Sequence, residues 1–327
     1  GLLYKGKLTI FLGAEIETNE GVGAAHNVAF FPHITQISGF SNELSQYITN
    51  INLSSQRARL KAYELLNLVQ DYDGELIPAH IFTPFKSFYG NCYDRISQAF
   101  HDKYCEIASV ELGLSSDTYL ADTISELSSK TFLSNSDAHS IGKIAREYNK
   151  LELKAPDFAS FLAALRVEEG NYVKANYGLN PRLGKYHRTL CLHCDHTAKE
   201  HPPVLKCPCC GSGNLTIGVL DRITEIADQQ KPIHPKIRPP YYHQIPLEFI
   251  PGVGKKTMEK LLLYFGSEMT VLHKANFEQL ADAVGEKIAG NIIAGRRGQL
   301  QLQAGGGGGY GKVKHRIFYN AFQQTLR

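Results

Sequence analysis

Asp137 and His139 are residues whose types and spacing suggest chemistry. They stand two residues apart and close a strand-like run, residues 131–136, that is apolar at its start. Because alternate residues of an extended chain point to the same side, the carboxylate and the imidazole can face one metal ion. Functional side chains are common where a barrel strand passes into its loop. An aspartate followed by a histidine is more often an ordinary surface loop, so the prediction needs further ligands.

Three more candidate ligands accompany apolar, strand-like runs. Glu15 and His80 each follow such a run, and His26 shortly precedes another. This mixture of carboxylates and imidazoles suits Zn, Mn or Fe. A single buried histidine is more often a hydrogen-bonded core residue, but five ligating side chains at strand ends favour a metal site. The predicted catalytic and metal-binding residues are Glu15, His26, His80, Asp137 and His139.

Three stretches around these residues, 13–17, 78–80 and 136–139, resemble the PHP (polymerase and histidinol phosphatase) superfamily. The resemblance implies an α/β fold, namely a distorted (β/α)7 barrel that holds a three-metal cluster in nine ligands. It also implies that Glu15 matches the bridging carboxylate and that the other four residues match further ligands. The expected catalytic metals are Zn, Mn or Mg.

The His-x-His pair that opens the superfamily's barrel has no counterpart, because no two histidines of this chain flank a single residue. Two interpretations are open. Either N-terminal strands are missing from the sequence, or the chain starts here and the cluster is incomplete. A barrel opening at about its third strand would leave an unpaired strand edge. We therefore expect that the N-terminal strands are missing.

Composition is that of an ordinary globular protein. Of 327 residues, 43% are hydrophobic and 20% charged, and the net charge of +3 neither favours nor excludes nucleic acid. No apolar run approaches the roughly 20 residues of a membrane helix, so no membrane partner is expected. Two stretches, 171–190 and 295–327, contain no acidic residue. Arg182 and Lys185 in the first are predicted phosphate contacts, as is Lys86, whose alternative is a solvated loop charge.

The alternation of strand-like and helical patterns predicts four parts. Residues 1–170 would form a parallel α/β sheet or barrel, 171–230 a basic bridge and a zinc-binding lobe, 231–246 a proline-rich linker, and 247–327 a helix-hairpin-helix domain with a glycine-rich tail. Apolar periodicity within these parts predicts the following elements: helices at 57–69, 157–167 and 221–230, a strand at 107–112, and a compact helical region at 247–298.

Five of the seven cysteines fall within twenty residues and form two Cys-x-x-Cys knuckles. Such knuckles can give four thiolates to one tetrahedral zinc ion, which would be structural because the site is closed. Cys209 is a spare, and His193 or His196 could replace one ligand. This spacing is not that of a secreted disulfide framework, so we expect a cytoplasmic location. The predicted zinc ligands are Cys191, Cys194, Cys207 and Cys210.

Residues 249–257, which contain the order Pro-Gly-Val-Gly-Lys, precede an apolar helix and resemble a helix-hairpin-helix motif. Two glycines let backbone N–H groups approach a phosphate, and the following helix N-terminus adds partial positive charge. Residues 284–289 resemble a degenerate second hairpin. The alternative is a plain helix–helix turn with solvated lysines. We expect contacts with the backbone of duplex DNA, made by Gly252, Gly254, Lys255 and Lys256.

This combination of modules resembles the endonuclease Q family, DNA repair nucleases of archaea and some bacteria, over essentially the whole chain. Further matching stretches are 83–90, 111–117, 176–187 and 310–312. The resemblance implies metal-dependent nicking of double-stranded DNA on the 5′ side of uracil, hypoxanthine, xanthine and abasic sites. A replication clamp is a candidate further partner.

A damaged base in a duplex must be flipped out before it can be examined. Our hypothesis is that a pocket near the metals reads it, lined by Phe85, Tyr89, Asn135 or Tyr177. Each of these residues by itself is more often part of the core or of loop packing. Two other functions remain open. A PHP-family phosphatase for a small phosphate ester would need neither the hairpin nor the zinc lobe. A non-catalytic DNA-binding protein with an incomplete metal site is favoured by the missing His-x-His pair.

Overall fold

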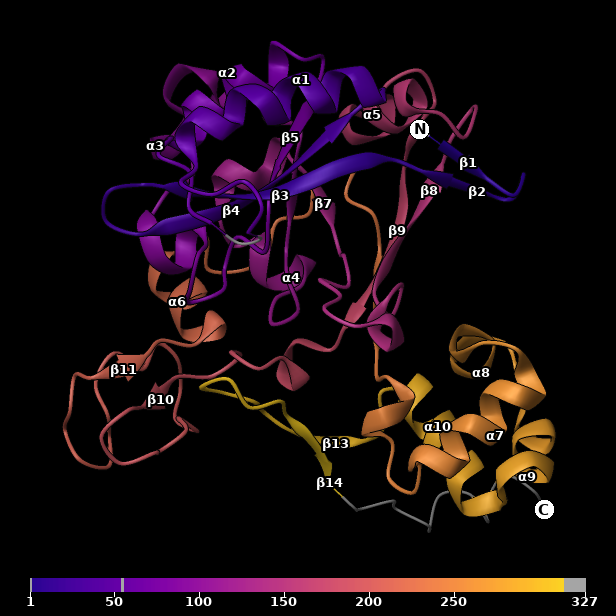
Figure 1. The fold of residues 1–327 in the computed structure, drawn as a ribbon. Helices are drawn as coiled ribbons and strands as arrows, with labels where there is room; N and C mark the ends of the chain where they lie inside the picture. The colour runs from indigo at the N-terminus through magenta and orange to yellow at the C-terminus, as the bar shows by residue number, and fades with distance from the viewer. Residues whose placement is uncertain (1, 54–55, 315–327) are drawn as a thin grey trace.

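The computed structural model describes residues 2–53 and 56–314, so Arg316 and Arg327 of the second acid-free stretch lie outside the described residues. Three bodies make up the molecule: an α/β body, a small lobe with β10 (Leu190–Cys191) and β11 (Leu215–Thr216), and a helical unit. The lobe and the helical unit lie below the α/β body on opposite sides (Figure 1). No described helix combines the length and apolarity that crossing a membrane requires.

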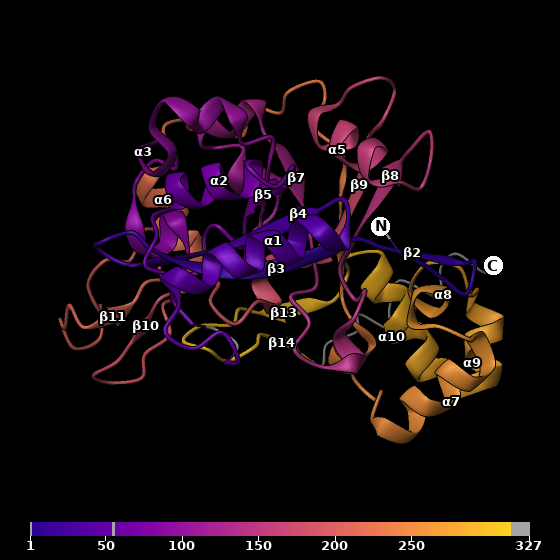
Figure 2. The same cartoon turned by 45° about the horizontal axis from the view of Figure 1, so that its top comes forward.

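The strands that carry the candidate ligands form a three-stranded sheet of β3 (Leu12–Asn19), β4 (Ala24–Phe31) and β5 (Glu75–Pro78), with β4 in the middle. Alternate residues of β4 are buried against the helices, as a two-residue period requires. Helices α1 (Ile34–Leu44) and α2 (Ala62–Gln70) cover this face (Figure 2). The same alternation turns His26 to the opposite face.

The α/β body contains two further groups of strands near this sheet. One pairs β6 (Ser109–Glu111) with β7 (Thr131–Leu133) in parallel. In the other, β9 (Tyr172–Leu179) pairs antiparallel with β8 (Tyr148–Glu152) and parallel with β12 (Tyr241–Gln244). The expectation of a parallel sheet is therefore correct only for β6–β7 and β9–β12. The pairs β3–β4, β4–β5 and β8–β9 are antiparallel, and the short turn between β3 and β4 can join strands only in that way.

The predicted helices exist with shifted ends. Helix α2 begins at Ala62 rather than at residue 57, because Arg57 is extended and bridges to Glu17 on β3. Asp157 caps α5 (Phe158–Arg166) by accepting a hydrogen bond from the Ser160 backbone N–H at 2.8 Å. The remaining elements of the body are β1 (Leu2–Tyr4), β2 (Leu8–Ile10), α3 (Ser97–Phe100), α4 (Thr118–Ala121) and α6 (Val219–Ile226).

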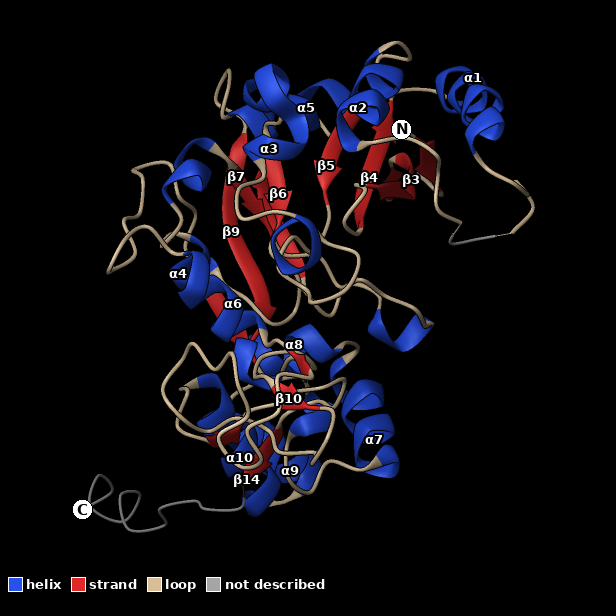
Figure 3. Ribbon diagram, turned by 90° about the vertical axis from the view of Figure 1, so that its left-hand side faces the viewer, coloured by secondary structure: helices blue, strands red, loops and turns tan. Residues whose placement is uncertain are grey.

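The helical unit below the α/β body (Figure 3) has a hydrophobic core that also includes Leu179 of β9 and Leu183 of the basic bridge. It comprises η7 (Leu247–Phe249), α7 (Lys255–Phe265), α8 (Glu268–His273), α9 (Phe277–Val284) and α10 (Glu286–Arg296). A hairpin follows, made of β13 (Gln301–Gln303) and β14 (Lys312–Lys314). Its glycine-rich loop docks onto the basic bridge through backbone hydrogen bonds, such as those from Gly305 N to Arg182 O and from Gly308 N to Lys185 O.

The proline-rich segment 231–246 packs on the α/β body and contributes β12 to its sheet. Arg238 anchors it, with a side chain only 2% exposed. The guanidinium Nη2 lies 2.7 Å from Asp122 Oδ1 and the group stacks over the ring of Phe132 at 3.4 Å. His234 holds the other Asp122 oxygen at 2.6 Å. The segment expected to be a linker is thus an integral part of the body.

Replacing Arg238 by alanine should lower the free energy of unfolding by about 3–5 kcal/mol, because Asp122 would keep a buried charge without its main partner. Urea denaturation measures the change. Lys174→Ala is the matched control, since it removes an exposed ion pair with Glu152 and should leave the free energy of unfolding nearly unchanged. Equal effects of the two substitutions would contradict this account of the segment.

Candidate metal centre and nucleic-acid interface

Three of the five predicted ligands meet at one point. Ligand atoms of Glu15, His26 and His80 all lie within 4.8 Å of one another. The Nδ1 atom of His26 faces both of its neighbours, 2.9 Å from Glu15 Oε1 and 3.1 Å from His80 Nε2. Glu15 and His26 lie inside β3 and β4, not at strand ends as predicted, whereas His80 follows β5. Neighbouring strands with side chains on one face bring the three together.

The spacing fits a divalent metal ion. Two ligand atoms about 2.0–2.1 Å from one tetrahedral ion lie roughly 3.3 Å apart, close to the observed separations. Hydrogen bonding by His26 lowers the pKa of the Glu15 carboxyl, with the charges of His26, His80 and His139 adding to the effect and burial opposing it. The lowered pKa favours the ionised carboxylate of Glu15, which is the form that binds a metal ion.

The imidazoles of His26 and His80 each have a carboxylate on the side away from the other ligands. Our sequence analysis did not assign these two carboxylates to the site. His26 Nε2 lies 3.4 Å from Glu17 Oε2, and His80 Nδ1 lies 3.5 Å from Glu111 Oε1. Metal-bound histidines usually have such a carboxylate behind them, which orients the ring. Glu17 follows Glu15 by two residues on one face of β3, so strand periodicity could have identified it. Glu111 gives no comparable signal in the sequence.

His80 lies among several acidic side chains. Its Nδ1 atom and Glu111 Oε1 are both buried and face each other at 3.5 Å. Burial lowers the pKa of His80, but hydrogen bonding and charge from Glu111, with the charges of Asp137 and Glu15, outweigh it and raise the pKa. Several anionic groups converge on this imidazole, and a bound cation would balance them.

Asp137 and His139 lie on the loop between β7 and β8, residues 134–147, which we name the ligand loop. Both line one pocket with His80, but they are outside the three-residue group described above. The His139 side chain is 87% exposed, and its Nδ1 atom lies 2.8 Å from the Asp137 carbonyl oxygen. The structure thus brings both predicted ligands to the rim of the pocket rather than into contact with the other three.

The predicted DNA contacts of the α/β body differ in their surroundings. Lys185 lines the same pocket, and its Nζ atom lies 4.8 Å from the centre of the Tyr310 ring. Arg182 is exposed on the neighbouring turn η6 (Pro181–Leu183). Lys86 places its Nζ atom 2.9 Å from Glu17 Oε2. Lys86 therefore holds Glu17 behind His26, whereas Lys185 is available to a ligand of the pocket and Arg182 is exposed outside the pocket lining.

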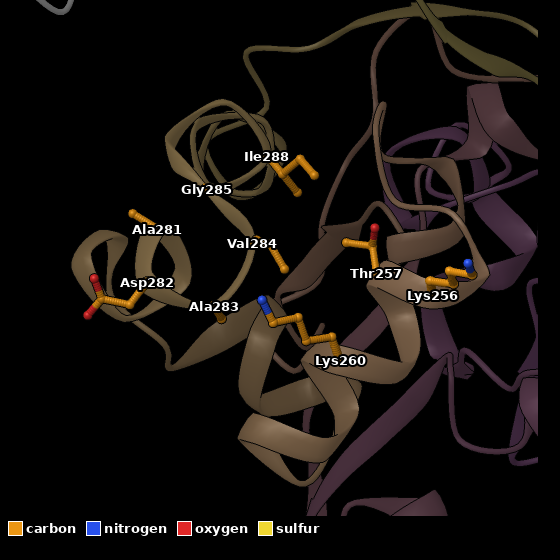
Figure 4. Close-up of a pocket in the computed structure, with 9 residues that line it drawn as sticks. All are labelled: Lys256, Thr257, Lys260, Ala281, Asp282, Ala283, Val284, Gly285 and Ile288. Carbon is orange, nitrogen blue, oxygen red and sulfur yellow. The ribbon is translucent and has the colours of Figure 1, made fainter.

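The two glycine turns of the helical unit lie side by side. Gly252 has a φ of +92° and Gly285 a φ of +84°, so each turn uses a backbone conformation that favours glycine. Asn291 Nδ2 joins the turns by donating to Pro251 O at 2.8 Å. An open groove of about 480 Å³ lies between α7, the end of α9 and the start of α10 (Figure 4). Its lining includes Lys256, Thr257 and Lys260 of α7 and Gly285 and Ile288 at the start of α10.

The four cysteines converge as predicted. Their Sγ atoms lie within 4.8 Å of one another, with Cys191–Cys210 and Cys194–Cys207 both at 3.6 Å. Thiolates about 2.3 Å from a tetrahedral zinc ion would be about 3.8 Å apart. Cys209 is exposed and outside the group. The cluster can hold one zinc ion between the two Cys-x-x-Cys turns of the small lobe.

Of the residues proposed to read a damaged base, Tyr89 does not fit. Its ring is completely buried, and its hydroxyl donates to Glu126 Oε1 at 2.6 Å. Tyr177 is stacked between Tyr148 and Tyr242. Asn135 Nδ2 donates to Glu111 at 2.9 Å. Phe85 is exposed and meets the ring of Tyr186, a pocket residue, edge-on at 5.6 Å.

Comparison with known proteins agrees with this architecture. Residues 118–169 match the family model described as PHP-associated. The chain is 46% identical over 317 residues to the uncharacterized protein YqxK of Bacillus subtilis. The matched region covers 96% of this chain and 80% of that protein. It is 40% identical to the uncharacterized protein MJ0043 of Methanocaldococcus jannaschii, over 71% of this chain and 31% of that protein.

Two solved structures share the fold over 95% of this chain at 34% identity. One is the lesion-specific endonuclease PfuEndoQ from Pyrococcus furiosus, with a TM-score of 0.80 and 81% of its chain covered. The other is endonuclease Q in complex with a 27-mer duplex substrate with an abasic lesion at the active site, with a TM-score of 0.82 and 82% covered.

Glu111→Gln should weaken metal binding at the candidate centre about 10- to 100-fold, because the group behind His80 loses its charge but keeps its shape. Titration with Mn²⁺ of protein depleted of metal at this centre, but not at the cysteine cluster, measures the affinity. The cysteine cluster provides an internal control, since its zinc content should be unchanged in the variant. Unchanged Mn²⁺ affinity would show that Glu111 does not support the centre.

Proposed function

This chain belongs to the endonuclease Q family, and from this premise we propose that it is a metal-dependent DNA repair endonuclease that nicks 5′ to deaminated bases (uracil, hypoxanthine, xanthine) and to abasic sites. One observation carries the proposal. Glu15, His26 and His80 converge beside a pocket that also contains Asp137, His139 and Lys185. We further propose a PHP-type distorted barrel for the α/β body and a cytoplasmic location, where thiolates stay reduced.

Three kinds of residue would take part in hydrolysis: the metal ligands, the carboxylates that orient them, and the basic residues that bind the phosphate. Bound Zn, Mn or Mg ions would acidify a water molecule and stabilise the charge that develops on the scissile phosphate. Glu15, His26 and His80 would hold the ions, and Asp137 and His139 would close the set from the ligand loop. Glu17 and Glu111 keep the two imidazoles in orientation. Lys185 and Arg182 would bind the phosphate beside the centre.

The helical unit would hold the duplex. The groove between α7 and α10 is lined by residues of the first turns of both helices, where backbone N–H groups lack helical partners and attract phosphate. Lys255 and Lys256 add full charges at the start of α7. Such contacts position a duplex without reading its bases, so recognition of damage would fall to the pocket beside the metal centre. The zinc lobe would stiffen the basic bridge.

We expect wild-type protein with Mn²⁺ or Mg²⁺ to nick a duplex at a single uracil and to leave the undamaged duplex intact. His80→Gln should reduce the rate constant of nicking by a factor of about 10³ or more, because the centre loses a ligand. End-labelled oligonucleotides on denaturing gels measure the rate and locate the cut.

Two outcomes would favour the other candidate functions. Phosphate release from a small ester, without nicking, would support a phosphatase. DNA binding without either activity, together with about one zinc ion per chain by metal analysis, would support a non-catalytic DNA-binding protein. A pull-down with a purified replication clamp tests the remaining partner prediction.

Replacing both Lys255 and Lys256 by alanine should weaken binding of any duplex and reduce the slope of log Kd against log salt by about 2, since each phosphate contact contributes about 0.9. Fluorescence anisotropy at several salt concentrations measures the slope. Lys150→Ala combined with Lys154→Ala removes two exposed lysines from the α/β body and is the matched control. A similar slope change in both pairs would contradict a specific role for the hairpin.

A further inference from the structure

Two isoleucines of the ligand loop are strongly exposed beside the metal pocket. Ile141 is 89% exposed and Ile144 is 66% exposed. Ile141 follows His139 by two residues, and His139 lines the pocket together with His80. Single exposed apolar side chains are common on protein surfaces. Two on one short loop that also carries candidate metal ligands are a feature that the proposed chemistry does not use.

The base of this loop is held firmly while its tip protrudes. The buried Arg146 guanidinium contacts Glu147 Oε1 at 2.7 Å and Glu248 Oε1 at 2.8 Å. Lys143 also pairs with Glu248, and Gln244 Nε2 donates to the Arg146 carbonyl oxygen at 3.0 Å. The short turn η5 (Ile141–Lys143) is therefore fixed to η7 and β12. A tip anchored in this way cannot easily fold its apolar side chains back onto the body.

The backbone is strained at both ends of the protruding segment. Asp137 has a φ of 45° and Ala145 a φ of 57°. Neither is a glycine, and residues with a Cβ atom are uncommon in this left-handed region. Strain of this kind persists where surrounding contacts enforce it, and it concentrates at functional sites. The two turns direct residues 138–144 outward at the rim of the pocket.

The position of the loop indicates what Ile141 would meet. Glu248, its anchor, precedes the Gly252 turn by four residues, so the loop is tied to the unit proposed to hold the phosphate backbone. The other end of the loop carries Asp137 at the metal pocket. A duplex held by the hairpin, with a phosphate at the metal centre, would present its base stack to the loop between these two points.

We propose that Ile141 is a wedge that enters the base stack of duplex DNA and fills the gap left when the damaged nucleotide leaves the helix. The inference rests on the proposed function. Proteins that kink or open a duplex commonly insert an apolar side chain between bases, and removal of a nucleotide from the stack must be offset by new contacts. Ile144 lies three residues further along the same loop. Lys143, between the two isoleucines, fixes the loop by pairing with Glu248.

The test compares two substrates that differ in whether the uracil is paired and stacked within the duplex. One is a fully paired duplex with a single uracil opposite guanine, and the other has the same uracil inside a short unpaired bubble. Ile141→Ala should lower kcat/KM on the paired duplex about 10- to 100-fold, but should change it less than about threefold on the bubble, where little unstacking is needed. Ile141→Leu should retain most activity on both substrates.

Ile34→Ala is the matched control, because Ile34 is also an exposed isoleucine, 56% exposed, but begins α1. It should leave both rates unchanged. Equal losses on the two substrates in Ile141→Ala would mean that the side chain only supports the loop, and this would overturn the wedge. Unchanged rates on both would overturn it as well. Wild-type protein that nicks neither substrate would instead refute the proposed function, and the wedge with it.

Discussion

Carboxylates behind the two central imidazoles hold the candidate metal centre in shape. Glu17 fixes His26 and Glu111 fixes His80, so both rings are oriented before any ion binds. Glu17 is itself held by Arg57 and Lys86. Burial of these charges is costly unless they are paired. The arrangement can therefore persist only if β3, β4, β5 and β6 keep their present places, and the metal centre depends on the whole sheet.

A chain of hydrogen-bonded side-chain amides connects this centre to the ligand loop. Asn135 donates to Glu111 at 2.9 Å and accepts from Asn149, whose carbonyl oxygen in turn accepts from Asn176 at 2.8 Å. The chain runs from β6 through the start of the ligand loop to β8 and β9. At its other end the loop is joined to the helical unit through Glu248. The ligand loop thus connects the unit that would hold DNA with the pocket that would cut it.

Sequence reasoning succeeded best where the ligands lie close together along the chain. The cysteine cluster follows from two knuckles, and the glycine turns follow from local backbone requirements at Gly252 and Gly285. It was less successful for the metal centre. Glu15 and His26 were assigned to strand ends, although their register within antiparallel strands is what joins them. Tyr89 was assigned to a base pocket, although it is a core residue. Burial and strand pairing depend on distant segments.

By itself, the sequence determined the residue types that can bind metal and phosphate, and the local turns that present them, because propensity and spacing act over a few residues. Only the tertiary structure decided which of these side chains meet. It placed Glu111 behind His80, put Asp137 and His139 at the rim, and built the proline-rich segment into the sheet. These outcomes arise from the pairing of segments that are far apart in the chain, where burial of charge and the packing of neighbouring strands select one arrangement.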